Sequence, residues 1–318
     1  MSRYTPVCFS SRVSSRQHFQ QTGLLPLSTV QRSSGSPGAG ADVRHFSSLT
    51  TSEEQKGEKR GQRGGKKGHQ GGKRVKLERD PRKINRKIVQ LGRDHKWKEM
   101  LSLCQKQKGN FDNVNYTTTM SQFGRSRSIR KDGPLLKEFL DDLSKKFRVH
   151  GFAWVRSQGI TNIVHAIGKI NLSGNDSAMR IVWRLEDDEN AILLVKNGSP
   201  QGIANCVWAC ATLGIKSPNL FGELERNTTW LVEDGKPQEV ANSVWACATL
   251  GIKSLNLFGE LERNATWLVE NGKPQEVANC AWACATLGIK SPNLFGELER
   301  NATWLVENGN PQEVANSI

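Results

Sequence analysis

Hydrophobic and polar positions follow a helical period through most of the second half of the chain. Counted at about 100° per residue, the apolar residues of segment 237–251 fall on one side of a helix and include Val240, Val244 and Cys247. The polar residues of the opposite side are Gln238, Asn242 and Thr249, with Trp245 at the border. This pattern predicts an amphipathic helix, which we call helix A.

Start and stop residues bound helix A and a second helix behind it. Pro237 fits the first helical position, where a missing N–H costs nothing, and Gly251 fits the left-handed position after the helix. Ser254 is expected to cap the second helix, helix B, which is predicted to run to Gly272. Each segment therefore predicts two helices of about 14 to 17 residues joined by short loops.

The two-helix pattern is a tandem repeat. Residues 237–273 and 274–310 are identical at 33 of 37 positions, and a degenerate earlier copy places His165 where later copies have Trp. At least four units can be read, and the prolines that begin them 37 residues apart are Pro200, Pro237, Pro274 and Pro311. Hairpins of this size cannot bury their faces alone. We therefore predict an all-α fold, an αα-hairpin solenoid of about 37-residue repeats, preceded by a disordered basic N-terminal region.

Charge divides the chain unevenly. The net charge is +14, with 32 basic and 13 acidic residues in 1–150 but 13 basic and 18 acidic residues in 151–318. The first 41 residues contain no Asp or Glu, and Arg44 stands three residues before a predicted cut after Phe46. This composition predicts an organellar transit peptide over 1–46, with a disordered basic tail as the alternative.

Three further segments follow the predicted leader. Residues 47–80 form a basic Gly/Lys/Arg-rich linker, predicted to be disordered, that can attract phosphates without sequence preference. Residues 81–150 predict degenerate helical hairpins and are similar to pentatricopeptide-type units over about forty residues. Residues 151–318 hold the tandem repeats.

The helix A sequence Pro-Gln-Glu-Val-Ala-Asn-Ser-Val-Trp-Ala-Cys-Ala-Thr-Leu-Gly of residues 237–251 closely resembles octotricopeptide repeats. These belong to organellar RNA-binding proteins related to FAST-kinase-like and RAP-domain proteins. The resemblance implies binding of single-stranded RNA at one nucleotide per repeat. The unit is one residue shorter than is usual in the family, and no RAP domain is present. We therefore expect the tandem repeats to be truncated at the C-terminus, and whether a RAP-like or catalytic module follows them stays an open alternative.

The polar side of helix A and the loop after it supply the candidate RNA contacts. Helix A amides and hydroxyls can hydrogen-bond base edges, and loop lysines can contact phosphates. These candidates are Gln201, Asn205, Thr212, Gln238, Asn242, Thr249, Gln275, Asn279, Thr286, Lys216, Lys253 and Lys290. The asparagines have an alternative role, a ladder of hydrogen bonds between repeats. The recurring Trp residues are predicted to pack rather than stack on bases, and Arg226, Arg263 and Arg300 to pair with neighbouring glutamates.

No residue pattern predicts catalysis, a metal site or a cofactor. Cysteine pairs such as Cys206 and Cys210 lie one helical turn apart, but the middle copy has Ser243 at the first position and no histidine completes a set. We interpret these cysteines as small buried residues. The six histidines are scattered, and no run of 18 apolar residues predicts a membrane span.

Together these features predict a non-enzymatic protein that binds single-stranded organellar RNA and supports its processing, stability, splicing or translation. The expected location is the mitochondrial matrix, with the plastid as the alternative. Other organellar RNA-processing or ribosomal proteins are further expected partners. The alternative function is a protein-interaction scaffold in an organellar ribonucleoprotein complex, which the net charge of −5 over 151–318 favours.

The near identity of the units generates a prediction about base choice. If helix A side chains select the base, units that carry the same Gln, Asn and Thr should select the same nucleotide in succession. Selection from a random RNA library should then return a short homopolymeric run. A mixed selected sequence would contradict this code.

Overall fold

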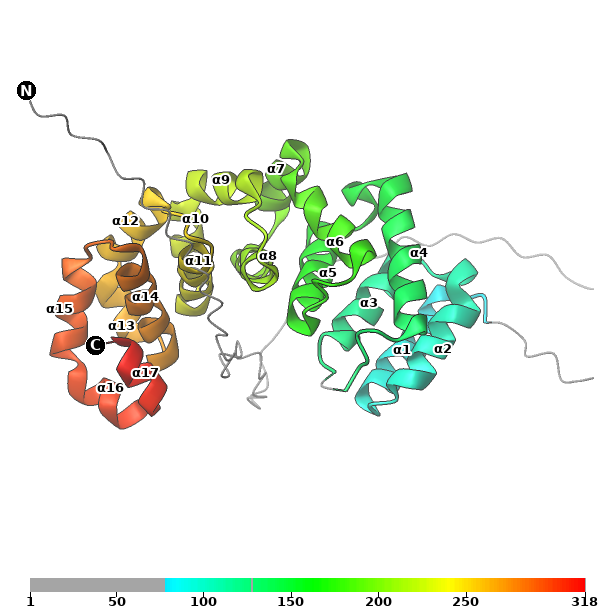
Figure 1. Cartoon of the computed structure of the whole chain (residues 1–318), viewed down its shortest axis with the longest axis horizontal. Helices are drawn as coiled ribbons and strands as arrows, with labels where there is room; N and C mark the ends of the chain where they lie inside the picture. The colour runs from blue at the N-terminus through cyan, green and yellow to red at the C-terminus, as the bar shows by residue number, and fades with distance from the viewer. Residues whose placement is uncertain (1–77, 127, 318) are drawn as a thin grey trace, which may run out of the picture. The chain divides into compact units, whose positions relative to one another are not determined.

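The computed structural model describes residues 78–126 and 128–317, and every regular element within them is a helix (Figure 1). The predicted all-α class is therefore confirmed for this part of the chain. The predicted transit peptide over 1–46 and nearly all of the predicted linker over 47–80 lie outside the described residues.

Helix pairs begin directly after the linker. The first two pairs are α1 (Pro81–Arg93) with α2 (Trp97–Gln107) and α3 (Asn113–Phe123) with α4 (Pro134–His150). The next unit consists of α5 (Ser157–Ile170), α6 (Asp176–Trp183) and α7 (Asp188–Asn197). Short 3₁₀ turns η1, η2 and η3 cover Lys108–Asn110, Phe152–Trp154 and Arg184–Glu186.

The tandem units contain three helices each. The first is α8 (Pro200–Leu213), α9 (Pro218–Arg226) and α10 (Thr228–Glu233), and the second is α11 (Pro237–Leu250), α12 (Leu255–Arg263) and α13 (Ala265–Asn271). The third is α14 (Pro274–Leu287), α15 (Pro292–Arg300) and α16 (Ala302–Asn308), followed by α17 (Pro311–Ser317).

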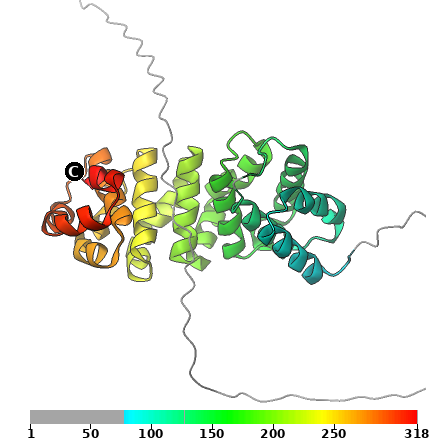
Figure 2. The same ribbon diagram turned by 90° about the horizontal axis from the view of Figure 1, so that it is seen from below.

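The helices pack in two rows. The A row contains the first helix of every unit in chain order, α1, α3, α5, α8, α11, α14 and α17, each against the next (Figure 2). The B row contains the remaining helices, in which α2, α4 and α6 pack in series, as do α7, α9, α12 and α15. The two hairpins of 81–150 therefore continue the same A row as the tandem units.

Helix A has the boundaries that the sequence predicts. α11 begins at Pro237, and the Glu239 carboxylate accepts a hydrogen bond from the backbone N–H of Lys236 at 2.6 Å. The helix ends at Gly251, whose φ of 68° lies in the left-handed region that glycine enters without a steric penalty. The degenerate unit uses Asn171, with φ 55°, at the same place.

Helix B differs from the prediction, because it is two helices rather than one. In the second tandem unit Asn264 separates α12 from α13, with φ −109° and ψ 22°. Its side-chain amide donates to the carbonyl of Glu260 at 2.9 Å. An asparagine side chain that bonds the backbone of the preceding turn competes with regular helix geometry. Asn227 and Asn301 make the same bond in the other units.

The predicted capping role of Ser254 is also wrong. Ser254 occupies the residue before α12, but its side chain makes no hydrogen bond to that helix and instead donates to the carboxylate of Glu225 in the preceding unit. The same carboxylate accepts from the backbone N–H of Asn256 at 2.8 Å, and the Asn256 amide donates to the Glu225 carbonyl at 3.1 Å. Glu225 therefore caps the first B helix of the next unit.

We call this set of bonds the inter-repeat clip. In the next pair of units the carboxylate of Glu262 accepts from the Ser291 hydroxyl and from the backbone N–H of Asn293, the latter at 2.6 Å. The serines are buried, so their hydroxyls need this partner. The clip sets the position of each B helix against the one before it.

One continuous apolar core lies between the rows. It runs from Ile84 in α1 to Leu305 in α16 without interruption. The boundary predicted between residues 150 and 151 therefore does not separate two cores, although it does separate unlike sequences. Within the A row the contacts are made by small residues, and a methyl group at Gly168 of α5 would lie 2.6 Å from Cβ of Ala209 in α8.

The inter-repeat clip predicts that removing a clip glutamate lowers stability more than removing the equivalent glutamate of the last unit. Glu262→Ala should lower the free energy of unfolding by about 1–3 kcal/mol, because it leaves the buried Ser291 hydroxyl and the Asn293 N–H without their acceptor. The control is Glu299→Ala, the same position in the last unit, where the exposed carboxylate accepts no hydrogen bond from a described residue. Urea denaturation should place the control within about 0.5 kcal/mol of wild type. Equal destabilisation by the two substitutions would contradict the clip.

Candidate nucleic-acid interface

The A row presents one side of each helix A away from the B row. In α11 every residue from Pro237 to Leu250 is buried except four that repeat at intervals of four, three and four. We call these positions in all A-row helices the outer face. In the tandem units they are Gln201, Asn205, Trp208 and Thr212; Gln238, Asn242, Trp245 and Thr249; and Gln275, Asn279, Trp282 and Thr286.

The predicted polar side of helix A is therefore confirmed as an accessible surface. The threonines Thr249 and Thr286 are exposed, and the glutamines and asparagines are exposed or half-buried. Thr212 is half-buried and donates to the Trp208 carbonyl at 3.0 Å. That these side chains contact RNA stays a prediction.

The asparagines of the outer face form no hydrogen-bond ladder. Asn205, Asn242 and Asn279 are half-buried, yet none makes a side-chain hydrogen bond to any described residue. Buried and half-buried amides normally find a protein partner, because losing hydrogen bonds to water is costly. Three equivalent amides whose donors and acceptors are not used by any described residue can bond a ligand that lies along this face.

The tryptophans of the outer face pack between units. Trp208 is only 9% exposed, and Trp245 and Trp282 are half-buried against the core. In the degenerate unit His165 takes this position, with its ring edge-to-face on Trp208 at a centroid distance of 5.4 Å. These rings fix the spacing of neighbouring helices, and each leaves only part of its surface beside the asparagine.

The acidic residues of the tandem units are engaged elsewhere. Glu239 and Glu276 cap their own helices, Glu225 and Glu262 form clips, and Glu260 pairs with Arg263 at 2.7 Å. None of the outer-face positions of α8, α11 and α14 is acidic. The outer-face positions of these three helices therefore place no carboxylate against a polyanion.

The basic side chains of the units divide into two groups. Arg226, Arg263 and Arg300 form ion pairs with the glutamates three residues before them, as the sequence predicts. The candidate phosphate ligands Lys216, Lys253 and Lys290 are exposed in the loop that follows helix A, and none forms an ion pair with a described residue. The loop lysines are thus available to a ligand, whereas the helix arginines are already paired.

The six cysteines among the described residues are free and buried. Desolvation raises the pKa of Cys210 and of Cys247 to about 12, so both remain thiols at neutral pH. No group of three or more His, Cys, Asp or Glu residues that could hold a metal ion occurs within 78–126 and 128–317. The cysteines contribute apolar volume between the rows.

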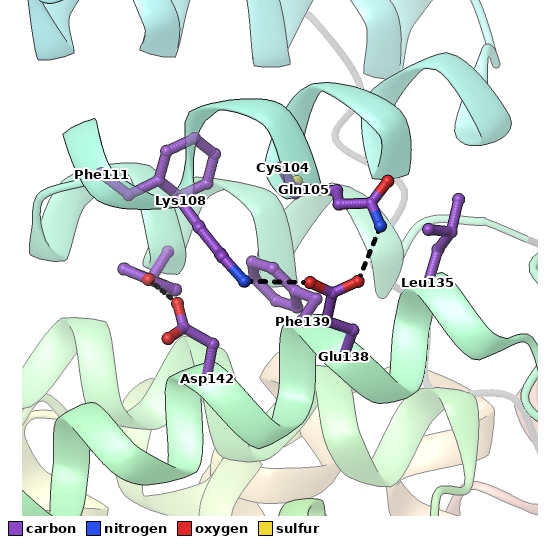
Figure 3. Close-up of a pocket in the computed structure, with 9 residues that line it drawn as sticks. Cys104, Gln105, Lys108, Phe111, Leu135, Glu138, Phe139 and Asp142 are labelled. Carbon is purple, nitrogen blue, oxygen red and sulfur yellow. Dashed lines mark hydrogen bonds and ion pairs between the residues drawn. The ribbon is translucent and has the colours of Figure 1, made fainter.

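A polar site outside the outer face lies between α2, α3 and α4 (Figure 3). Glu138 accepts from Lys108 at 3.1 Å and from Gln105 at 2.9 Å, and the Tyr116 hydroxyl donates to Asp142. Desolvation and the Asp142 carboxylate raise the pKa of Tyr116. The cavity volume is about 10 Å³, enough for about one water molecule. Every polar group here already has a partner, so the site joins helices and offers no space for a ligand.

Comparison with known proteins adds no assignment. No family model matches the chain, and no curated protein matches it. The described helices include none that is both long and apolar enough to cross a bilayer.

The half-buried, largely desolvated imidazole of His165 predicts acid destabilisation. Desolvation, with a smaller effect of Lys169, lowers the pKa of His165 from 6.5 to about 4. As the pH falls from 6.5 towards 4, the unfolded chain binds a proton that the folded chain does not, so stability decreases. Through His165 alone, the free energy of unfolding should be about 1–2 kcal/mol lower at a pH of about 5 than at neutral pH. His165→Trp, which installs the residue of the later units, should remove this share of the pH dependence in urea denaturation. If the variant loses as much unfolding free energy between neutral and acidic pH as wild type does, the prediction is wrong.

Proposed function

We propose that the protein binds single-stranded RNA along the outer face of its A row and acts as a non-enzymatic adaptor in RNA maturation, stability, splicing or translation. The observation that carries the proposal is that the amides of Asn205, Asn242 and Asn279, one per unit at the same position, have no hydrogen-bond partner among the described residues. Extended single strands expose base edges to such side chains, and helical repeat proteins bind one base per repeat.

The charge distribution supports RNA over a protein partner. The outer face of the tandem units carries no carboxylate, and each unit adds an exposed lysine beyond helix A at Lys216, Lys253 and Lys290. Amides can bond bases while the lysines contact phosphates, which gives each unit one polar and one ionic contact. A surface evolved to bury a folded partner would be expected to present an apolar centre, whereas the tryptophans of this face are nearly buried (Trp208) or half-buried (Trp245 and Trp282).

The cellular site of this function is part of the proposal. The acid-free, arginine- and serine-containing first 41 residues support import into the mitochondrial matrix. The basic tract from Lys56 to Lys76 would add attraction to phosphates without sequence preference. Its contribution is the same in every variant that changes only the repeats.

Negative charges introduced on the outer face should abolish most of the binding. Asn205→Asp, Asn242→Asp and Asn279→Asp together place three carboxylates where the strand would lie, with little change in side-chain volume. We expect RNA affinity at low salt to fall by roughly 10²-fold or more, since like-charge contacts oppose a polyanion. Fluorescence anisotropy of the full chain with labelled RNA measures the effect.

A matched control changes the net charge equally on the B row. Arg226→Gln, Arg263→Gln and Arg300→Gln also lower the charge by three in the same units, and they break ion pairs whose arginine side chains are exposed. This control should bind within about threefold of wild type. If both triple variants bind with the same reduced affinity, or if the wild-type chain binds no RNA, the proposal fails and the protein-scaffold alternative takes its place.

A further inference from the structure

The outer face continues beyond the tandem units into the N-terminal hairpins. Close contacts between neighbouring A-row helices show which positions of α1, α3 and α5 are equivalent. A methyl group at Gly168 of α5 would lie 2.6 Å from Cβ of Ala209, and one at Gly124 after α3 would lie 3.1 Å from Cβ of Ala166. At Gly92 of α1 it would lie 2.2 Å from Oε1 of Gln122. Each glycine therefore stands at the same place, the approach to the next A helix.

The outer-face positions of each helix lie at the same sequence distances from its contact glycine. In α5 they fall one residue after Gly168 and three, six and ten residues before it, which gives Lys169, His165, Asn162 and Gln158. The same offsets from Gly124 give Arg125, Ser121, Thr118 and Val114, and from Gly92 they give Arg93, Val89, Arg86 and Arg82. All of these positions are exposed or half-buried, in agreement with the register.

Four arginines therefore share the outer face with the amides of the later units. Arg82, Arg86, Arg93 and Arg125 are exposed, and none forms an ion pair with a described residue. The acid next in sequence, Asp94, accepts instead from Gln90 at 2.9 Å. No outer-face position in any described A-row helix from α1 to α17 is Asp or Glu. The outer face is thus basic at α1 and α3 and neutral from α8 onward.

We infer that the arginines of α1 and α3 bind the phosphate backbone of the same RNA strand whose bases lie along α8, α11 and α14. This inference rests on the proposed function and assigns separate tasks to the two ends of the face. Guanidinium groups bind phosphate oxygens through two parallel hydrogen bonds and stay charged at all relevant pH values. Such contacts give affinity without base preference, whereas the amides discriminate between bases. Continuity with the amide positions favours RNA over an anionic membrane as the partner.

Neutralising the four arginines tests this division. In the full chain, Arg82→Gln, Arg86→Gln, Arg93→Gln and Arg125→Gln should weaken binding to a labelled RNA of about twelve nucleotides by roughly ten- to a hundredfold at low salt. The slope of log K against log salt concentration should become shallower by up to about 3, or about 0.7 for each phosphate that the variant no longer neutralises. The ratio of affinities between the preferred homopolymer and the other three should stay as in wild type.

The control removes four positive charges from the B row. Lys98, Lys106, Lys137 and Lys145 on α2 and α4 are exposed and pair with no described residue, and their replacement by Gln should leave the salt slope near the wild-type value. Circular dichroism verifies the fold of both variants. If the control and the arginine variant weaken binding equally, or if the arginine variant changes base preference, the inference fails while RNA binding itself stands. Arginine-dependent binding to phosphatidylserine vesicles without any effect on RNA would also overturn it.

Discussion

Close approach of neighbouring A helices is the constraint on which the structure depends. The helices touch through residues with little or no side chain, such as Gly168 against Ala209, so there is no room to shift one helix along the next. Most large apolar side chains lie on the side that faces the B row, and the tryptophans of the outer face are the exception. The side that remains, opposite the B row, is the only one on which polar residues can face solvent, and it therefore recurs in every unit. An ordered line of amides follows from the packing of small residues.

Side chains that stabilise the fold and side chains proposed to bind RNA lie in different parts of the structure. Carboxylates of the B row and of the helix starts are used in caps, clips and ion pairs, for example Glu225 with Asn256 and Glu260 with Arg263. None of the outer-face positions is acidic, and the side-chain amides of Asn205, Asn242 and Asn279 make no hydrogen bond to a described residue. The net charge of residues 151–318 is negative, yet none of the outer-face positions is acidic. The net charge of this half alone is therefore no argument against RNA binding on the outer face.

Helix A could be predicted because its signals are local. Pro237, Gly251 and the spacing of Val240 and Val244 each act within a few residues, and the structure places them as expected. The division of helix B depends on the side chain of Asn264, which can either face solvent or bond the backbone of the preceding turn, and sequence does not distinguish the two. The partner of Ser254 lies 29 residues away in the preceding unit, so its capping role was wrongly assigned.

The arginines of the outer face were missed because the period is irregular there. The corresponding glycines Gly92, Gly124 and Gly168 are separated by 32 and then 44 residues, whereas the later units repeat at 37. A search for a constant interval cannot align α1 and α3 with the tandem units. The contacts between neighbouring A-row helices are what align the positions of α1 and α3 with those of the tandem units. The exposed side of α1, with Arg82, Arg86 and Arg93 opposite Ile84 and Ile88, was the one local signal that could have indicated a basic surface.

The inter-repeat clip has a consequence for how such a chain can change over generations. Glu225 contacts only the unit that follows it, and Ser291 and Asn293 present the same groups as Ser254 and Asn256. Loss of residues 237–273 by unequal crossing-over would bring Glu225 to Ser291 and Asn293 and so recreate the clip, and duplication of the same segment would also preserve it. Insertion and deletion of whole units therefore keep the clip intact, while they alter the length of the outer face in steps of one three-helix unit.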